Sequence, residues 1–205
     1  MSILQNISNS ILGKASILQN IAKQTLAGGK INYTDNQPTV TAPAYTFPQG
    51  VKPEWQSAFT EAAKRTNIQI GTVVNRASAE HGGTWDPTTR GILDPNDYGL
   101  TQLNPSAVAT ITGSGGGRNY YKDNFGEEFD INNPIHQILG ASIMDNYNRQ
   151  FALPEVGITN PTEYDIFMAY NLGAKGYAEY KAGVPSRKEK GDRYSKMLKG
   201  KVMLK

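Results

Sequence analysis

The sequence predicts a mainly α-helical domain that follows an N-terminal helical extension. Four segments carry apolar residues at helical spacing, and each is bounded by proline, glycine or a helix-capping residue: residues 54–66, 68–80, 130–151 and 161–173. A proline-rich stretch, residues 30–53, separates them from an earlier amphipathic segment. Strand potential is limited to a short hairpin through Thr88–Leu93.

Length and composition bound the class of protein. The 205 residues suit one domain with an extension. A net charge of +3 is too small to argue for nucleic-acid binding by itself, and no specific nucleic acid is expected. The absence of cysteine excludes disulfides, thiolate metal sites and cysteine nucleophiles. With only His81 and His136 as histidines, we expect neither a metal site nor a cofactor.

No segment reaches the ~18–20 uninterrupted apolar residues of a transmembrane helix. We expect no signal peptide either, because the N-terminal apolar residues form no compact core. They are interrupted by Asn6, Asn9, Lys14, Gln19 and Asn20.

The first 27 residues predict one long amphipathic helix. Ser-Ile-Leu-Gln-Asn-Ile at residues 2–7 recurs at 16–21, an offset of two heptads. The resulting apolar stripe needs a partner, either its own domain or an assembly or membrane-surface contact. With a boundary near residue 48, residues 1–47 form this helix and a Pro-rich linker, and residues 48–205 form the domain.

Helix 68–80 ends with Glu80, and Gly82-Gly83 stops it. Position alone favours a solvated glutamate. A carboxylate at the end of an apolar helix that faces a cleft would instead have a raised pKa, because burial disfavours its ionised form. Such a group can act as a general acid near neutral pH.

The segments after Glu80 alternate between loops and packed elements. Residues 84–98 are rich in turn signals, and Gly99 begins a packed element that Ser106–Ile111 continues. Gly113–Arg118 lacks the Gly-Lys-Ser/Thr ending of a phosphate loop and predicts a flexible loop. From Ser186 onward, eight basic and two acidic residues give a local net charge of eight minus two, +6. Such a run is typical of a solvated or frayed terminus, or of attraction to an anionic polymer.

Four blocks of sequence, in this order, resemble the soluble lytic transglycosylases. They are Glu80 with Trp85-Asp-Pro87, Gly99-Leu-Thr-Gln102-Leu-Asn-Pro105, Asp130 to Tyr147 with Gly140-Ala141, and Ala169-Tyr-Asn-Leu-Gly173. The resemblance covers roughly residues 54–185 and leaves out the first 50. The chain departs from the family pattern at His81, where serine is usual, at Tyr98, where a small residue is common, and in the longer segment from Thr88 to Asn96.

The resemblance implies a lysozyme-like, mainly helical fold and cleavage of the β-1,4 bond between N-acetylmuramic acid and N-acetylglucosamine in peptidoglycan. Glu80 would protonate the glycosidic oxygen and then deprotonate the muramic 6-hydroxyl, which closes a 1,6-anhydro ring. It further implies substrate-binding roles for a set of residues near Glu80. Gly99, Leu100 and Gln102 would border the cleft, Tyr170 and Asn171 would flank Glu80 and the sugar, and Trp85 and Tyr98 would stack on sugars or hold the loop.

Two other functions remain open at this point. A goose-type-like lysozyme would need a second carboxylate ~6.5–9.5 Å from Glu80 to activate water, and Asp94 and Asp97 are the candidates. A structural virion protein or wall-binding protein could keep the fold without activity.

The expected partners are peptidoglycan glycan strands and, through residues 2–27, other virion proteins, copies of this chain or a membrane surface. A helical assembly segment joined by a Pro-rich linker suits a phage particle. There the enzyme would sit in the tail or inside the capsid and act on the host periplasm and cell wall during genome entry. A secreted bacterial enzyme is the second possible setting.

Overall fold

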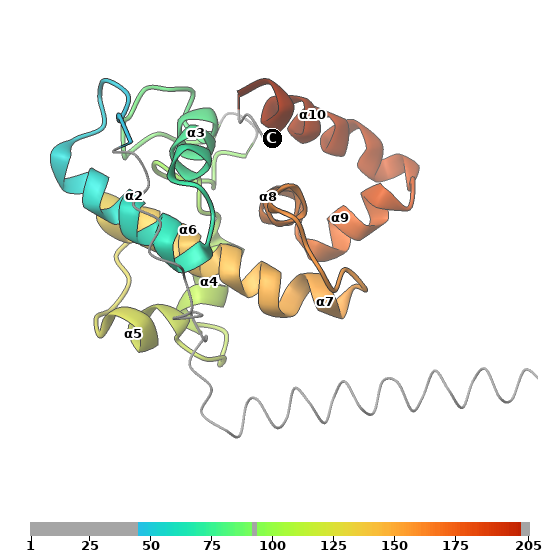
Figure 1. The fold of residues 1–205 in the computed structure, drawn as a ribbon. Helices are drawn as coiled ribbons and strands as arrows, with labels where there is room; N and C mark the ends of the chain where they lie inside the picture. Colours follow the sequence, from blue (N-terminus) through green and yellow to red (C-terminus); the bar gives the residue numbers. More distant parts are fainter. Residues whose placement is uncertain (1–44, 92–93, 202–205) are drawn as a thin grey trace, which may run out of the picture. The chain divides into compact units, whose positions relative to one another are not determined.

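Helices make up nearly all regular secondary structure in the computed structural model, which describes residues 45–91 and 94–201. The mainly α fold predicted from the sequence is thereby confirmed (Figure 1). The helix expected at residues 2–27 and most of the linker lie outside the described residues. The helices are α2 Pro53–Thr66, α3 Ile70–Glu80, α4 Pro105–Thr112, α5 Tyr120–Phe125, α6 Pro134–Tyr147, the π-helix η1 Asn148–Ala152, α7 Leu153–Glu155, α8 Glu163–Leu172, α9 Ala174–Lys181 and α10 Pro185–Lys201.

Helices α2 and α6 lie side by side and form the centre of the core (Figure 1). Pro53 starts α2 because its fixed φ suits the first helical turn, and Trp55 and Phe59 then bury one face. Most residues of α6 are buried, and the Asn133 side chain caps its first turn. Gly140 is required on α6, since a Cβ there would lie 2.8 Å from the ring of Phe129.

Helix α3 carries Glu80 at its last position. Its start differs slightly from the predicted residue 68, because Gln69 is extended and serves as the N-cap. Val73, Val74 and Ala77 are buried, so the apolar face predicted from helical spacing is the one that packs. The chain turns sharply after Glu80, with Gly82 and Gly83 both at positive φ.

Strand pairing is confined to a few residues. The backbone N–H of Gly91 donates to Asp97 at 3.0 Å, and that of Gly99 donates to Thr89 at 2.9 Å. Residues 89–91 therefore pair with residues 97–99, further along the chain than the predicted hairpin through Thr88–Leu93. Tyr98 also bridges to Leu103, which closes the segment back on itself.

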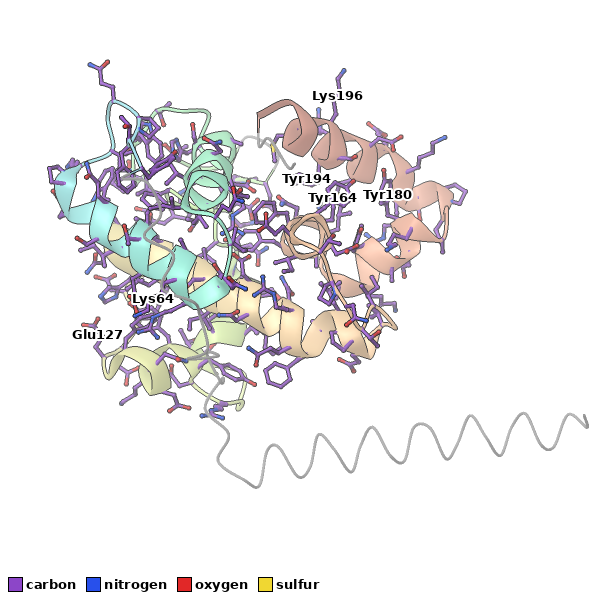
Figure 2. All side chains as sticks on the ribbon, viewed as in Figure 1. Lys64, Glu127, Tyr164, Tyr180, Tyr194 and Lys196 are labelled. Carbon is purple, nitrogen blue, oxygen red and sulfur yellow. The ribbon has the colours of Figure 1, made fainter. Side chains whose placement is uncertain are left out.

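The expectation of a frayed C-terminal tail is wrong for residues 185–201, which form α10, although most of its described side chains are solvated as expected. Tyr194 and Ser195 are buried, and the Tyr164 hydroxyl of α8 lies 2.8 Å from Ser195 Oγ. Figure 2 shows Tyr164, Tyr180 and Tyr194 gathered beside α8 and α10, while Lys196 extends outward. The basic residues thus occupy the outer side of a docked helix. None of the described helices has the length and apolar character to cross a membrane.

Candidate active site

Glu80 ends α3 with its carboxyl group mostly withdrawn from solvent. Its Oε1 atom is buried and has no hydrogen-bond partner in the described part of the chain. Burial raises the pKa of Glu80 to about 7, against the lowering effects of the Arg76 charge and of a hydrogen bond from Asn171. At neutral pH the group is therefore close to half protonated, so it can both give and accept a proton.

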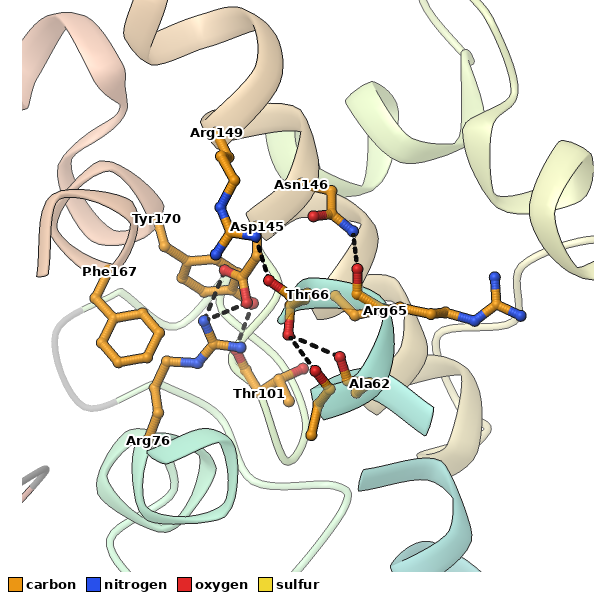
Figure 3. A network of polar contacts seen from close by, with 12 residues as sticks. Ala62, Arg65, Thr66, Arg76, Thr101, Asp145, Asn146, Arg149, Phe167 and Tyr170 are labelled. Carbon is orange, nitrogen blue, oxygen red and sulfur yellow. Dashed lines mark hydrogen bonds and ion pairs between the residues drawn. The ribbon is translucent and has the colours of Figure 1, made fainter. Parts of the chain in front are cut away.

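A buried ion pair lies one helical turn before Glu80. Arg76 Nη1 contacts both carboxylate oxygens of Asp145 on α6 at 2.6 Å (Figure 3). The guanidinium also lies over two rings of α8, 4.6 Å from the centre of Phe167 and 5.0 Å from that of Tyr170. Arg76 thus joins α3, α6 and α8 directly behind the acid.

Tyr170 and Asn171 occupy the last turn of α8, which begins at a capping box formed by Thr162 and Asp165. The Asn171 side chain lowers the pKa of Glu80, and its Nδ2 donates to the Phe167 carbonyl at 2.9 Å. The Tyr170 hydroxyl donates to the Thr101 carbonyl at 2.7 Å. Burial raises the pKa of Tyr170, and the negative charge of Glu80 adds to that shift. The structure therefore brings both residues to Glu80, with the Tyr170 hydroxyl already engaged by the next loop.

The loop that carries Gly99 and Leu100 is held by one side chain of α6. Gln137 accepts a hydrogen bond from the Leu100 N–H at 2.8 Å, and its own amide donates to the Pro87 carbonyl at 3.0 Å. Gly99 has φ 79° and lies against Gln137, where any side chain would collide. Sequence reasoning missed Gln137, although a polar residue on an otherwise apolar helix face was the available signal.

Gln102 lies inside this loop with 6% of its surface exposed. Its Nε2 donates to the Gly99 carbonyl at 2.7 Å and to the Thr89 carbonyl at 3.1 Å. Its Oε1 is buried without a hydrogen-bond partner in the described residues. The amide thus fixes the loop, with its Oε1 enclosed there without a hydrogen-bond partner among the described residues.

Trp85 packs in the interior rather than standing on the surface. It is 8% exposed and meets Phe59 edge-on at 6.0 Å and His81 at 4.5 Å between ring centres. Its backbone N–H donates to His81 Nδ1 at 3.2 Å. Burial lowers the pKa of His81 to about 4, so the imidazole is neutral at pH 7. Of the two roles left open for Trp85, this position fits holding the loop after Glu80.

The remaining loop candidates differ in their relation to Glu80. Tyr98 is half-buried, and the Arg90 guanidinium lies over its ring, 4.5 Å from the ring centre. Asp94 is exposed and accepts the Asn96 N–H at 2.9 Å in a turn. Asp97 is half-buried with a raised pKa, and its negative charge helps to raise that of Glu80. Asp97 is thus the candidate second carboxylate that acts on the acid.

Tyr194 of α10 was not identified from the sequence. Its side chain is 6% exposed, and burial raises the pKa of Tyr194 to about 12. The charges of Glu80 and Asp97 contribute to this shift, which places the phenol near both carboxylates. The available signal was a lone aromatic residue in a run of basic ones, and the expectation of a frayed tail concealed it.

Residues 45–91 and 94–201 contain no group of three or more His, Cys, Asp or Glu side chains that could hold a metal ion. No protein-family model matches the chain, and no match is found among curated proteins. The chemistry of the residues around Glu80 is therefore the guide to what this protein does.

Proposed function

We propose that this protein is a peptidoglycan lytic transglycosylase whose single catalytic acid/base is Glu80. The observation that carries the proposal is the Glu80 carboxyl group at the end of an apolar helix, whose Oε1 is buried without a hydrogen-bond partner among the described residues and whose pKa burial raises to about 7. A pKa near the working pH suits a group that must donate a proton in one step and remove one in the next.

In the proposed reaction, protonated Glu80 gives its proton to the oxygen that links N-acetylmuramic acid to N-acetylglucosamine. The bond from C1 to that oxygen breaks, and the glucosamine leaves as an alcohol. Ionised Glu80 then removes the proton of the muramic 6-hydroxyl as its oxygen bonds to C1. The nucleophile belongs to the substrate, so water is not consumed and no second carboxylate is required.

The neighbours of Glu80 support this assignment. The Asn171 side chain limits the rise of the Glu80 pKa. Gln102 holds the neighbouring loop in place through its hydrogen bonds to the Thr89 and Gly99 carbonyls. The phenols of Tyr170 and Tyr194 stay neutral at pH 7, because burial raises their pKa values above the ordinary value of 10.

A hydrolytic lysozyme is the second candidate function, and the electrostatic coupling of Asp97 to Glu80 is the observation that favours it. Asp97 would act as the base that activates water. The exposed Asp94, held in its own turn, suits this role less well. A non-catalytic wall-binding or virion protein fits less well, because a fully solvated Glu80 would be expected in that case.

The biological setting belongs to the proposal as well. We place the enzyme in a phage particle, where it opens the host wall locally during genome entry. The amphipathic pattern of residues 2–27 supports this placement, since it suits assembly with virion proteins or with copies of the same chain.

The test is a digest of purified peptidoglycan with the wild-type protein and with Glu80→Gln, read by mass spectrometry. The proposal expects muropeptides that end in 1,6-anhydro-muramic acid, lighter by one water than reducing-end products and absent for the variant. Reducing-end products would establish the hydrolase, and Asp97→Asn would then be the next variant. No cleavage by a folded wild-type protein would leave the non-catalytic function.

A further inference from the structure

The Arg76–Asp145 pair is costly to bury for the stability it provides. The two side chains are 2% and 1% exposed. Removing two charges from water costs about as much free energy as their attraction returns, so apolar residues of similar volume often serve stability as well or better. Stability alone therefore does not account for a buried ion pair at this position, one helical turn from Glu80.

The contacts of the pair join three helices and lead on to the loop before α4. Arg76 lies on α3, Asp145 on α6, and the guanidinium packs on Phe167 and Tyr170 of α8 (Figure 3). The Tyr170 hydroxyl in turn donates a 2.7 Å hydrogen bond to the Thr101 carbonyl, which connects α8 to this loop. Thr101 in turn donates to the Gln137 carbonyl at 3.0 Å and precedes Gln102. One guanidinium thus fixes the ring and the loop that border the acid.

The charges around Glu80 come from several elements. Arg76 is the positive group with the largest effect on its pKa, whereas Asp97 of the loop and Asp145 of α6 are negative. Tyr170 of α8 and Tyr194 of α10 face it as neutral phenols. Further out, Arg149 of η1 acts on Asp145, and Lys190 of α10 acts on Asp97. Asp145 therefore offsets part of the positive charge that Arg76 presents to Glu80.

We propose that the Arg76–Asp145 pair is a positioning device for the acid. It clamps Tyr170 and the Thr101 loop beside Glu80, and it presents a partly neutralised positive charge to the carboxyl group. The expected effect of the pair on kcat rests on the proposed function. Its electrostatic effect concerns only the titration of Glu80. Both residues act through others and touch no substrate.

Three variants separate the positioning of Tyr170 and the Thr101 loop from the effect of charge on Glu80. They are Arg76→Met, Asp145→Asn and the double variant. The titration of Glu80 is followed by NMR of protein labelled with ¹³C at glutamate carboxyl carbons, with Glu80→Gln to assign the signal. Asp145→Asn leaves Arg76 unopposed and lowers the Glu80 midpoint by about one pH unit, the lower end of the effect of a close opposite charge. Arg76→Met removes the positive charge and raises the midpoint. The double variant removes both charges, so its Glu80 midpoint rises, but by less than in Arg76→Met, because Asp145 offsets part of the Arg76 charge.

Kinetics on soluble glycan fragments then test the clamp. The double variant loses the guanidinium that holds the Tyr170 ring, so we expect kcat at the pH optimum of each protein to fall about tenfold or more from misplacement, with KM little changed. Asp123→Asn is the matched control, since it breaks the exposed Arg118–Asp123 ion pair on α5 with the same chemical change. It should alter neither the titration nor kcat.

The outcomes are distinguishable. A Glu80 midpoint that stays fixed in both folded single variants overturns the electrostatic part of the proposal. If the single variants do not fold, the double variant decides, and wild-type kcat in the folded double variant overturns the clamp. If the wild-type protein leaves peptidoglycan intact, the proposed function fails by itself, while opposite shifts of the Glu80 midpoint still support the device.

Discussion

Glu80 and His81 are adjacent in sequence, and burial moves their pKa values in opposite directions. The carboxyl pKa rises to about 7 and the imidazole pKa falls to about 4, because a low-dielectric environment disfavours the charged form of each. The two groups therefore link stability to pH with opposite signs. In the wild-type protein their effects largely cancel between about pH 4.5 and 6.5, and single variants separate them.

Glu80→Gln should remove the contribution of the raised carboxyl pKa. The folded state holds this proton up to pH about 7, whereas the unfolded state releases it near its ordinary value of 4.5. The stability that protonated Glu80 provides is thus complete below pH 4.5 and is lost as pH rises through 7. Relative to wild type, the variant should gain about 1–3 kcal/mol between pH 4.5 and 7.5, after allowance for partial solvent screening. Urea unfolding at a series of pH values measures this difference, and a constant difference would contradict the prediction.

His81→Gln should show the opposite dependence. The folded imidazole stays neutral down to pH about 4, whereas the unfolded one binds a proton near 6.5. Its contribution is present above pH 6.5 and is lost as pH falls through 4. Wild type should therefore lose about 2–3 kcal/mol relative to the variant between pH 6.5 and 4, measured by the same unfolding series. Glutamine can still accept the Trp85 N–H, so a loss of fold at pH 7 would mean that the imidazole ring itself is required.

At the scale of single elements, helical spacing located α2, α3, α6 and α8 within a few residues. Their apolar faces are broad, and proline or capping residues mark where they begin. Helix α10 was missed because its outer face carries most of its side chains, and these are charged. Its docking depends on Tyr194, on Ser195 and on the absence of a side chain at Gly191. These three residues form no periodic apolar pattern in the sequence.

The same limit applies to the candidate site. Glu80 could be found because it ends a helix at a recognisable Gly-Gly stop, and Asn171 because its segment resembles a motif of the lytic transglycosylases. Gln137, Asp145 and Tyr194 reach the site only because α6 and α10 pack against α3 and its loop. Pairings between residues this far apart in sequence are set by tertiary packing, which a local pattern does not specify.

Two glycines on neighbouring helices offer a paired test of α10 docking. A Cβ at Gly191 would collide with the ring of Tyr180, whereas one at Gly176 of α9 would meet its nearest neighbour at an ordinary 3.6 Å. Gly191→Ala should destabilise by about 1–3 kcal/mol through overpacking. It should also lower activity, because the docked helix carries Tyr194 to Glu80.

Gly176→Ala makes the same chemical change without a collision, and its better helix propensity should stabilise by up to about 1 kcal/mol. Thermal unfolding of both variants checks the opposite signs. Equal effects from the two substitutions would mean that α10 does not depend on contact between Gly191 and Tyr180.

At the scale of the whole molecule, the candidate site draws on parts of the chain that are far apart in sequence. Glu80 comes from α3, Asp97 from the loop, Asp145 from α6, Asn171 from α8 and Tyr194 from α10. None of these helices can place its residue without the packing of the others. The pKa of Glu80 is therefore a property of the complete fold, and we expect it to return to its ordinary value when any one of these elements undocks.

Deletion of residues 1–30 tests whether the extension serves assembly while the domain carries out cleavage. Within the described part of the chain, residues 45–91 and 94–201 hold a buried core and the groups that shift the pKa of Glu80, so the shortened protein should cut purified peptidoglycan at close to the wild-type rate. The repeat at residues 2–7 and 16–21 gives one apolar stripe that needs a partner, so removal of the stripe should abolish incorporation into phage particles. Zymography of the purified protein and immunoblotting of purified particles measure the two effects separately. Normal incorporation of the shortened protein would show that the domain, and not the extension, carries the contact with the particle.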